Sequence, residues 1–427
     1  MSFAFTANAA QDWAAAPARG DIRQRLVIPV LIAALTFNFG LCFVNTSVMH
    51  VSAGLVMLSE VVLIGLTFLL VVDRSPAMHA VLVGIVSYLG AIMLVRGVAD
   101  PKILRDLLIP VVFYTLGRTR GTYEIGDRVV TWSILIVLGV SLFEWMFLDT
   151  FLKFFDVLGY YVSRGTVDPS AAGHGSGLFI SGTRFEGRTL LPFLGEHRVS
   201  SVFLEPVSMG NFGAVTFAWV LSRDLKRPAV FIAKTLAIMT ILVLGDARFG
   251  MYICGITLAL YCVAPFVRPI MVYIAPFLAI IAIVSYTTMK GNVSWDNTIW
   301  GRFLLAGQMI GTLDAQQIFG IVWTTTDYND SGYAYVMSQL GIVGFAALWA
   351  VFVFIPVPKG QPQRFTLFMG FYVVLLLCIS VSLCTIKTAA LAWFLAGTCG
   401  RPALAAAATR LSARASGQAH REAAYAA

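Results

Sequence analysis

Charged residues are scarce in this chain of 427 residues: they make up 12% of it, where about 25% is usual in a soluble protein. Apolar residues make up 58%, against about 45 to 50% in a typical soluble domain. A soluble domain does not need that many apolar residues. The composition therefore excludes an ordinary soluble protein and favours one that lies in a membrane.

Cysteine is also sparse, with six residues that all fall in or at the ends of apolar segments and form no CxxC pair. This usage argues against a disulfide framework and against a metal cluster. No DxD motif or histidine cluster accompanies the acidic residues, so we expect neither a metal nor another cofactor. A metal site built from Asp327 and Asp330 is the minor alternative.

The sequence contains many long apolar segments. A helix of about 20 apolar residues crosses a bilayer core roughly 30 Å thick. The sequence predicts an all-α, polytopic integral membrane protein with about 12 transmembrane helices. The fourth segment is short and contains Pro110, which predicts a tilted, broken or re-entrant helix. The predicted spans are 26–45, 51–72, 77–96, 103–117, 129–148, 205–221, 228–245, 248–266, 268–287, 332–356, 365–382 and 384–400.

Two long polar loops, 150–204 and 288–331, interrupt the apolar segments and are predicted on the same membrane face. With the N-terminus inside, more than half of the Lys and Arg residues fall on the cytoplasmic side, as the positive-inside rule requires. The loops are then periplasmic, 26–400 is the membrane domain, and 1–25 and 401–427 are cytoplasmic, the first span serving as an uncleaved signal anchor. The net charge of +8 follows from this topology, and no nucleic-acid partner is expected.

Glu60 and Glu144 are the main acids within the predicted spans. An intramembrane acid is a functional hypothesis by default. The alternative, which we favour, is that Glu144 lies near the outer interface and Glu60 is paired inside the bundle.

Residues 198–206 (RVSSVFLEP) lead into the sixth span. A helix that begins on the outer side points its free amides and positive dipole end there, which suits an anion. Arg198 matches phosphate geometry with paired donors, and a simple salt bridge at the rim is the alternative. For Glu205, a helix cap and a catalytic carboxylate are equally consistent with the pattern.

Two further arginines lie on the same predicted face. Residues 245–250 (GDARFG) suit a tight hairpin capped by Asp246, but a hairpin alone does not explain Arg248 at the start of a helix. Arg302 either contributes to an anion site or belongs to a solvated amphipathic helix. Guanidinium groups gathered at one membrane surface predict an anionic ligand, with a phosphate-linked lipid as the first candidate.

Residues 327–333 (DYNDSGY) lie at the start of the tenth span. Taken alone, they are typical of an ordinary helix cap. In the first loop, Arg184 and Arg188 are weaker candidates for contact with sugar or phosphate. The Gly- and Ser-rich stretch 172–177 is consistent with a mobile cover over the site and equally with a passive loop.

Taken in order, these motifs resemble the superfamily of Wzy-type polysaccharide polymerases and O-antigen ligases. The likeness rests on 198–206, on 246–250 (DARFG), and on 330–333 (DSGY) followed by 340–344 (LGIVG), and it covers about 26–400. Xanthan-type exopolysaccharide polymerases are the nearest branch. In the ligase branch a histidine occupies the place of Asp330, so this sequence departs from that pattern.

The resemblance implies a metal-independent, inverting glycosyl transfer at the periplasmic face of a bacterial inner membrane. The donor is a glycan on undecaprenyl diphosphate, the acceptor is a lipid-linked repeat unit, and undecaprenyl diphosphate is released. Membrane lipid, a chain-length regulator and export proteins are the further partners that it implies.

The residue chemistry agrees with this outline, because breaking a sugar–diphosphate bond builds negative charge that fixed cations stabilise. An ordinary aspartate is ionised at neutral pH, so we predict that Asp330 orients or deprotonates the acceptor, with Glu205 or His197 as rivals. The predicted diphosphate ligands are Arg198, Arg248 and Arg302, and the secondary contacts are Arg184, Arg188, Asp246 and Tyr333. A transporter or flippase for anionic lipid-linked glycans, and a non-catalytic component of an export assembly, remain as alternatives.

Overall fold

The computed structural model describes residues 22–72, 76–168, 178, 180–183, 190–291, 298–324, 326, 328 and 330–400. Within this part of the chain the fold consists of helices, and the pairing of Thr183 with His197 is an isolated β-bridge. The predictions for Arg184, Arg188, Asp327 and the stretch 172–177 fall outside the described residues.

Helices follow the predicted apolar segments closely along the chain. The α-helices are α2 (Ile22–Arg25), α3 (Val27–Ser47), α4 (Ala53–Val71), α5 (Pro76–Arg96), α6 (Pro101–Arg120), α7 (Tyr123–Met146), α8 (Leu148–Phe154), α9 (Val157–Ser163), α10 (Pro206–Arg223), α11 (Pro228–Leu244), α12 (Arg248–Val263), α13 (Pro269–Lys290), α14 (Ile299–Gly311), α15 (Ala315–Ile318), α16 (Gly332–Phe354), α17 (Gln361–Leu377) and a last helix over 386–400. The short 3-10 turns are η3 (Ile180–Gly182), η4 (Pro192–Leu194), η5 (Ser201–Phe203), η6 (Ala264–Phe266) and η7 (Ser382–Cys384).

Seven of the described helices are long and apolar enough to cross a membrane. These candidates are α3 together with α2, α4, α5, α7, α12 with η6, α13 and α16. An all-α polytopic membrane protein is therefore confirmed. Helices α6, α10, α11, α17 and the last helix also cover predicted spans, and their crossing stays a prediction.

The fourth predicted span is one continuous helix, α6, which passes through Pro110 without a break. Of the three predicted forms, the broken helix is therefore wrong, and a tilted or re-entrant helix stays a prediction. Its low mean hydropathy has another cause, since the first two turns carry Lys102, Arg105 and Asp106. Charges at both ends of the helix, with Arg118 and Arg120 in its last turn, set it apart from the seven apolar helices.

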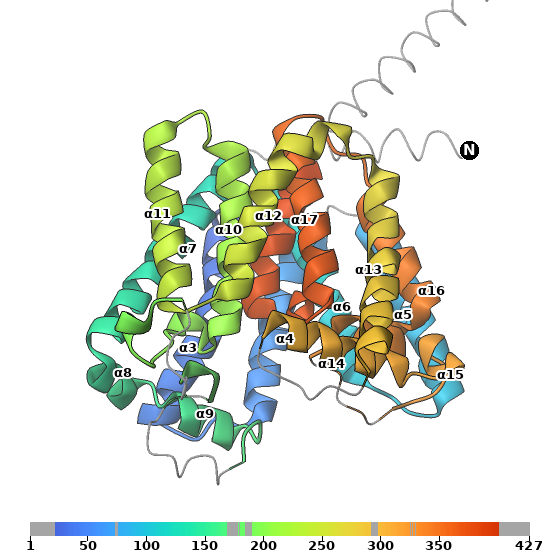
Figure 1. Ribbon diagram of the computed structural model, residues 1–427, viewed down its shortest axis with the longest axis horizontal. Coiled ribbons are helices and arrows are strands. Elements are labelled where there is room, and N and C mark those ends of the chain that lie inside the picture. The colour runs from blue at the N-terminus through green and yellow to red at the C-terminus, as the bar shows by residue number, and fades with distance from the viewer. Residues whose placement is uncertain are drawn as a thin grey trace, which may run out of the picture.

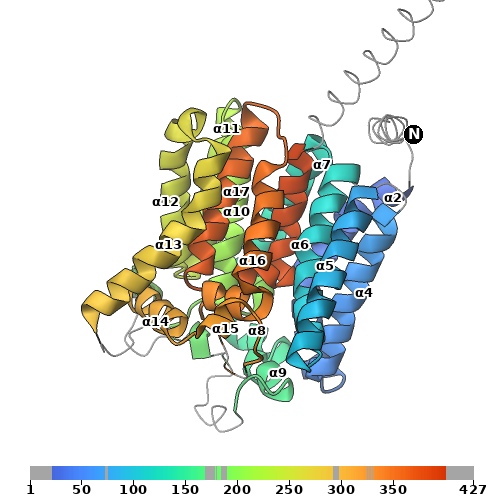
Figure 2. The same cartoon turned by 90° about the vertical axis from the view of Figure 1, so that its right-hand side faces the viewer.

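The two polar segments of the sequence meet at one end of the helix bundle (Figures 1 and 2). Helices α8 and α9, from the segment between α7 and α10, lie at this end, and so do α14 and α15, from the segment between α13 and α16. We call this the loop end. The opposite end holds the turn between α10 and α11.

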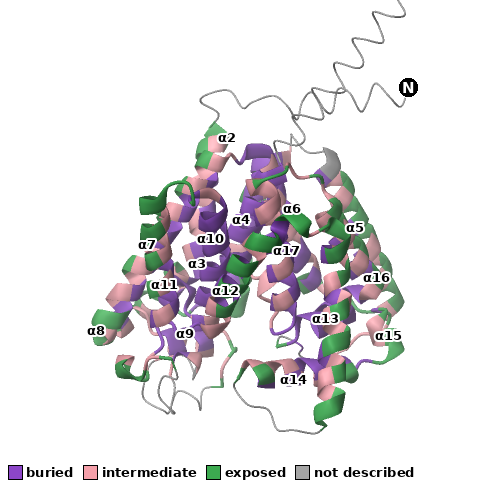
Figure 3. Ribbon diagram, turned by 45° about the horizontal axis from the view of Figure 1, so that its top comes forward, coloured by how far each residue is buried: buried purple, intermediate pink, exposed green. Residues whose placement is uncertain are grey.

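Helix α10 lies inside the bundle, and nearly all its residues are buried (Figure 3). Glycines allow its neighbours to approach closely. A Cβ atom at Gly250 of α12 would lie 2.5 Å from the backbone oxygen of Gly210 in α10. Between α6 and the last helix, a Cβ atom at Gly117 or at Gly397 would collide with the backbone of the other helix. Close contact through small residues is the usual way that membrane helices pack.

Helix α16 is interrupted at Gly341, whose φ of 71° and ψ of 158° are not helical. The carbonyl groups that lose their helical partners are bonded by side chains of α5. Arg96 donates to the oxygens of Ser338 (2.8 Å) and Gln339 (3.0 Å), and Tyr88 donates to that of Leu340 (2.6 Å). The positive φ explains glycine at this position, since other residues rarely adopt it.

Candidate functional site

Glu144, at the end of α7, holds the Ser200–Ser201 turn of the loop end in place. Its side chain is fully buried, and its carboxylate accepts hydrogen bonds from the amides of Ser200 (3.0 Å) and Ser201 (2.6 Å) and from the Ser200 hydroxyl (3.2 Å). The Nε2 atom of His197 lies 3.2 Å from the same carboxylate. Glu144 thus lies near the end of α7 and anchors the loop, and its position at the outer membrane interface stays a prediction. His197 contacts this anchor, which weakens its candidacy as the base.

Arg198 ties the same loop to the turn between α11 and α12. Its guanidinium donates to the backbone oxygens of Gly245 (3.2 Å), Asp246 (3.2 Å) and Ser181 (2.9 Å), and the residue is only 9% exposed. Asp246 is buried as well. The predicted phosphate contact of Arg198 and the secondary contact of Asp246 are not supported by this geometry, because both residues hold the loop and the turn together.

Backbone strain is concentrated in these two segments. Ser201 (φ 52°), Leu204 (φ 60°) and Asp246 (φ 43°) are the non-glycine residues with positive φ in the described part of the chain. Such conformations cost on the order of 1–3 kcal/mol each and cluster at functional sites, where the surrounding contacts maintain them. Here the contacts of Glu144 and Arg198 do so, and the result is a fixed position for Glu205.

Glu205 caps α10 without a side-chain bond to its amides and instead contacts Lys387 of the last helix. The Lys387 ammonium is 3.0 Å from the Glu205 carboxylate and donates to the Phe203 oxygen (3.0 Å), and it is only 4% exposed. Tyr161 of α9 (2.7 Å) and Ser208 (3.1 Å) also donate to Glu205. The helix-cap interpretation is therefore incomplete, because this carboxylate is the centre of a polar network.

The pKa of Glu205 follows from this network. Burial alone would raise the pKa, but the Lys387 charge and the hydrogen bonds from Tyr161, Lys387 and Ser208 outweigh it and lower the pKa below its ordinary value. Burial and the adjacent Glu205 raise the pKa of Tyr161 well above its usual range. Tyr161 therefore remains protonated and Glu205 ionised at neutral pH.

A second charged network lies at the same end, between α4, α6 and α16. Arg105 bonds to Glu60 (2.9 Å) and to its neighbour Asp106 (2.7 Å), and the Tyr335 hydroxyl donates to Asp106 (2.6 Å). The Lys102 ammonium lies 5.4 Å from the centre of the Tyr335 ring. The prediction that Glu60 is paired inside the bundle is confirmed.

The two networks are neighbours rather than separate features. Glu60 lies within electrostatic range of Lys387 and of Arg164, which follows α9. The Arg164 guanidinium stacks over the rings of Tyr160 (5.1 Å) and Tyr161 (5.4 Å). The loop end therefore holds one group of alternating cations and carboxylates.

Arg302 of α14 and Asp330, just before α16, come together although 28 positions separate them in the chain. An Arg302 Nη1 atom lies 3.9 Å from an Asp330 Oδ1 atom, with 28% and 63% of the two side chains exposed. Arg248 is half-buried at the first residue of α12. These three predicted residues keep accessible side chains. Tyr333 does not, since it is fully buried and its hydroxyl donates to the Val374 oxygen (2.9 Å).

An apolar cavity of about 310 Å³ lies beside the second charged network. Leu107 and Cys384 are among its lining residues, and Cys384 lies within electrostatic range of Arg105 and Asp106. The lining continues along the bundle through Leu340, Leu348, Phe352, Val373 and Trp393, with Arg118 and Thr115 among its few polar members. The cavity thus approaches the network of Arg105 and Asp106 at the loop end, while the charged residue of its own lining is Arg118.

Sequence reasoning missed Lys387, Arg105, Asp106 and Arg164. A charge inside an apolar span is a signal for the first three, since such residues are rare and usually functional. Arg164 gave no signal, because it looks like any other loop arginine until the fold places it over two tyrosines.

The part of the chain described by the structure contains no group of three or more His, Cys, Asp or Glu placed to hold a metal ion. No protein-family model, curated protein or solved structure matches the chain. The fold and the site thus define an all-α polytopic membrane protein with a charged group at one end of its helix bundle.

Proposed function

We propose that the chain is a bacterial exopolysaccharide polymerase that joins undecaprenyl-diphosphate-linked repeat units at the loop end, which faces the periplasm of the inner membrane. The observation that carries the proposal is the apolar cavity, whose lining residues Leu107 and Cys384 lie close to the network of Arg105 and Asp106 at the loop end. A polyprenyl diphosphate needs apolar space for its chain directly beside cations for its phosphates. The resemblance of the motif order to Wzy-type polymerases supports the same assignment.

In the proposed reaction the acceptor hydroxyl attacks the anomeric carbon of the donor glycan. The new bond joins the acceptor oxygen to that carbon, and the bond from the carbon to the diphosphate oxygen breaks with inversion. Asp330, the more exposed member of its pair, takes the hydroxyl proton. Arg302 and Arg248 stabilise the charge on the departing undecaprenyl diphosphate.

Glu205 and Lys387 have a supporting task in this proposal. A buried ammonium beside a half-buried carboxylate fixes both side chains and the strained turn that precedes α10. Glu205 stays the rival to Asp330 as proton acceptor, because 31% of its side chain is exposed.

The decisive experiment gives purified protein in lipid nanodiscs a synthetic lipid-linked repeat unit. A polymerase produces a ladder of longer glycans and releases undecaprenyl diphosphate. An O-antigen ligase-like transferase produces a single addition to a supplied acceptor, and a transporter or flippase moves the unit across vesicles without a new linkage. Folded protein that yields no product beyond one repeat would contradict the proposal.

A further inference from the structure

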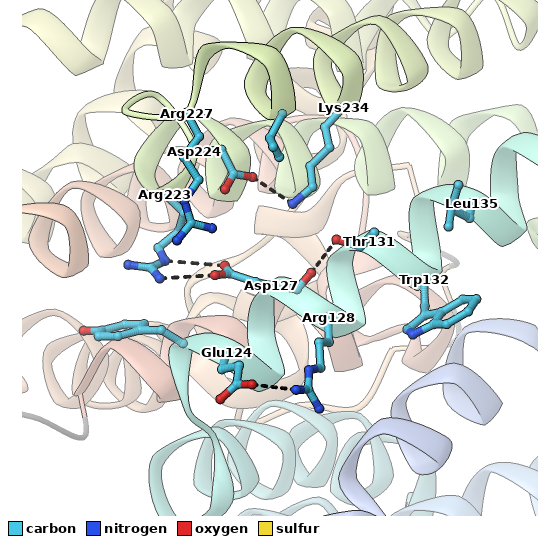
Figure 4. A pocket seen from close by; sticks show the side chains of 12 residues that line it. Glu124, Asp127, Arg128, Thr131, Trp132, Leu135, Arg223, Asp224, Arg227 and Lys234 are labelled. Atoms are coloured by element: carbon cyan, nitrogen blue, oxygen red, sulfur yellow. Dashed lines mark hydrogen bonds and ion pairs between the residues drawn. The ribbon is translucent and has the colours of Figure 1, made fainter.

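The opposite end of the bundle carries an open, charged cleft of about 740 Å³ that the loop-end chemistry does not use. It lies between α7, the end of α10 and the start of α11, and Figure 4 shows its side chains. Four cations and three acids line it: Arg128, Arg223, Arg227, Lys234, Glu124, Asp127 and Asp224. Its volume is in the range of small-ligand sites.

Each acid of the cleft has a cationic partner. Arg223 is 3.2 Å from Asp127, Lys234 is 2.8 Å from Asp224, and Arg128 pairs with Glu124, as the dashed lines in Figure 4 show. This leaves Arg227. Its side chain is exposed and makes no hydrogen bond or ion pair with any other residue that the structure describes. The cleft therefore carries one net positive charge. Its paired cations can also contact a further anion.

One wall of the cleft is apolar and faces outward. Trp132 (56% exposed) and Leu135 (53%) of α7 and Val230 (39%) of α11 belong to it. Helix α7 is one of the seven helices that can cross a membrane, so this wall continues into the surface that faces lipid. Tryptophan and basic side chains together are typical of the membrane–water interface.

We propose that this cleft binds an anionic phospholipid from the leaflet at the opposite end. The headgroup phosphate contacts Arg227 and Lys234, and the acyl chains lie along Trp132, Leu135 and Val230. A soluble phosphate would have no use for the apolar wall, and a zwitterionic lipid would leave the extra charge unmatched. The inference is independent of the proposed polymerase activity, because it requires only that the helices lie in a membrane.

Native mass spectrometry of the full chain in detergent tests it, with phosphatidylglycerol and phosphatidylcholine as probes. We expect phosphatidylglycerol to bind more tightly, Arg227→Ala to weaken it roughly five-fold, and Trp132→Ala to weaken both lipids. The matched control is Arg268→Ala, an exposed arginine at the same end that does not line the cleft.

Equal loss of phosphatidylglycerol in Arg227→Ala and Arg268→Ala would overturn the site, since binding would then follow general surface charge. Equal affinity for the two lipids would overturn the anion selectivity. Displacement of phosphatidylglycerol by millimolar inorganic phosphate or glycerol 3-phosphate would show a soluble-anion site instead.

Discussion

The ammonium group of Lys387 lies 3.0 Å from the Glu205 carboxylate and joins the last helix to the residue that precedes α10. The two side chains come from positions 182 residues apart, and the lysine is almost completely buried. Removing one partner of such a pair leaves the other charge uncompensated. The pair should therefore govern stability and its dependence on pH.

We expect Lys387→Met to lower the free energy of unfolding by about 3 kcal/mol, at the low end for a buried pair because Glu205 is partly exposed. The double variant Lys387→Met/Glu205→Gln should lose much less than the sum of the single variants. Thermal or denaturant unfolding in detergent measures this. Additive losses would show that the two groups do not interact.

The lowered pKa of Glu205 gives a pH dependence with a defined sign. Because the folded state binds the Glu205 proton more weakly than the unfolded state, the carboxylate contributes stability that is full above the unfolded pKa and is lost as the pH falls through the folded pKa. The stability difference between the native chain and Glu205→Gln should therefore shrink on acidification. A difference that stays constant from neutral pH down to pH 3 would contradict the lowered pKa.

Arg198 and Arg302 should respond differently to replacement by alanine. Arg198→Ala removes three charge-assisted bonds to carbonyls and should cost about 3 kcal/mol of stability. Arg302→Ala breaks an exposed pair and should change stability by less than about 1 kcal/mol while it abolishes polymer formation. Unfolding curves and the ladder assay are read on the same preparations. A stable, inactive Arg198→Ala protein would restore the phosphate role to Arg198.

Asp330→Asn should lower the rate of polymerisation by roughly 10²- to 10⁴-fold without loss of folded protein, as expected for removal of a general base. Asp149→Asn, at an exposed acid of α8 near the same end, is the matched control and should retain activity. If Asp330→Asn stays fully active, the proton acceptor is another group, and Glu205→Gln becomes the next variant to assay.

Filling the apolar cavity should weaken substrate binding more than chemistry. Leu348→Trp places an indole in the cavity, and we expect about a ten-fold higher KM for the lipid-linked unit, equivalent to about 1.4 kcal/mol. Val343→Trp, at an exposed position of the same helix outside the cavity lining, is the control. Equal KM values for the two variants would show that the cavity does not bind the substrate.

Gly250→Ala should destabilise the contact between α12 and α10 by about 1–3 kcal/mol, because the added methyl group meets backbone that cannot yield easily. Gly255→Ala, in the same helix with open space around it, should be neutral or slightly stabilising. Thermal unfolding of the two variants distinguishes the effect of packing from that of helix propensity.

The helices could be predicted from the sequence because lipid-facing and buried residues alike must be apolar over a fixed length. Pro110 misled this reasoning, since a proline is tolerated inside a membrane helix when its neighbours satisfy the freed carbonyl. The pairing of Glu60 was also within reach, because an intramembrane acid needs a partner.

Contacts between side chains that are far apart in the sequence could not be predicted. Arg198 looked like a phosphate ligand because its donors suit phosphate, yet they suit the carbonyls of Gly245 and Asp246 just as well. Lys387 was overlooked as a single charge in an apolar stretch. Only the fold shows that the strained turn before α10 brings Glu205 to it.

The break at Gly341 divides α16 into two shorter helical segments. The half that begins at Gly332, two residues after Asp330, carries Tyr335, and Arg96 bonds its other end to α5. The other half runs on toward the opposite end with its own packing. Because the helix is interrupted at Gly341, the half beyond this glycine is not rigidly coupled to the half beside Asp330.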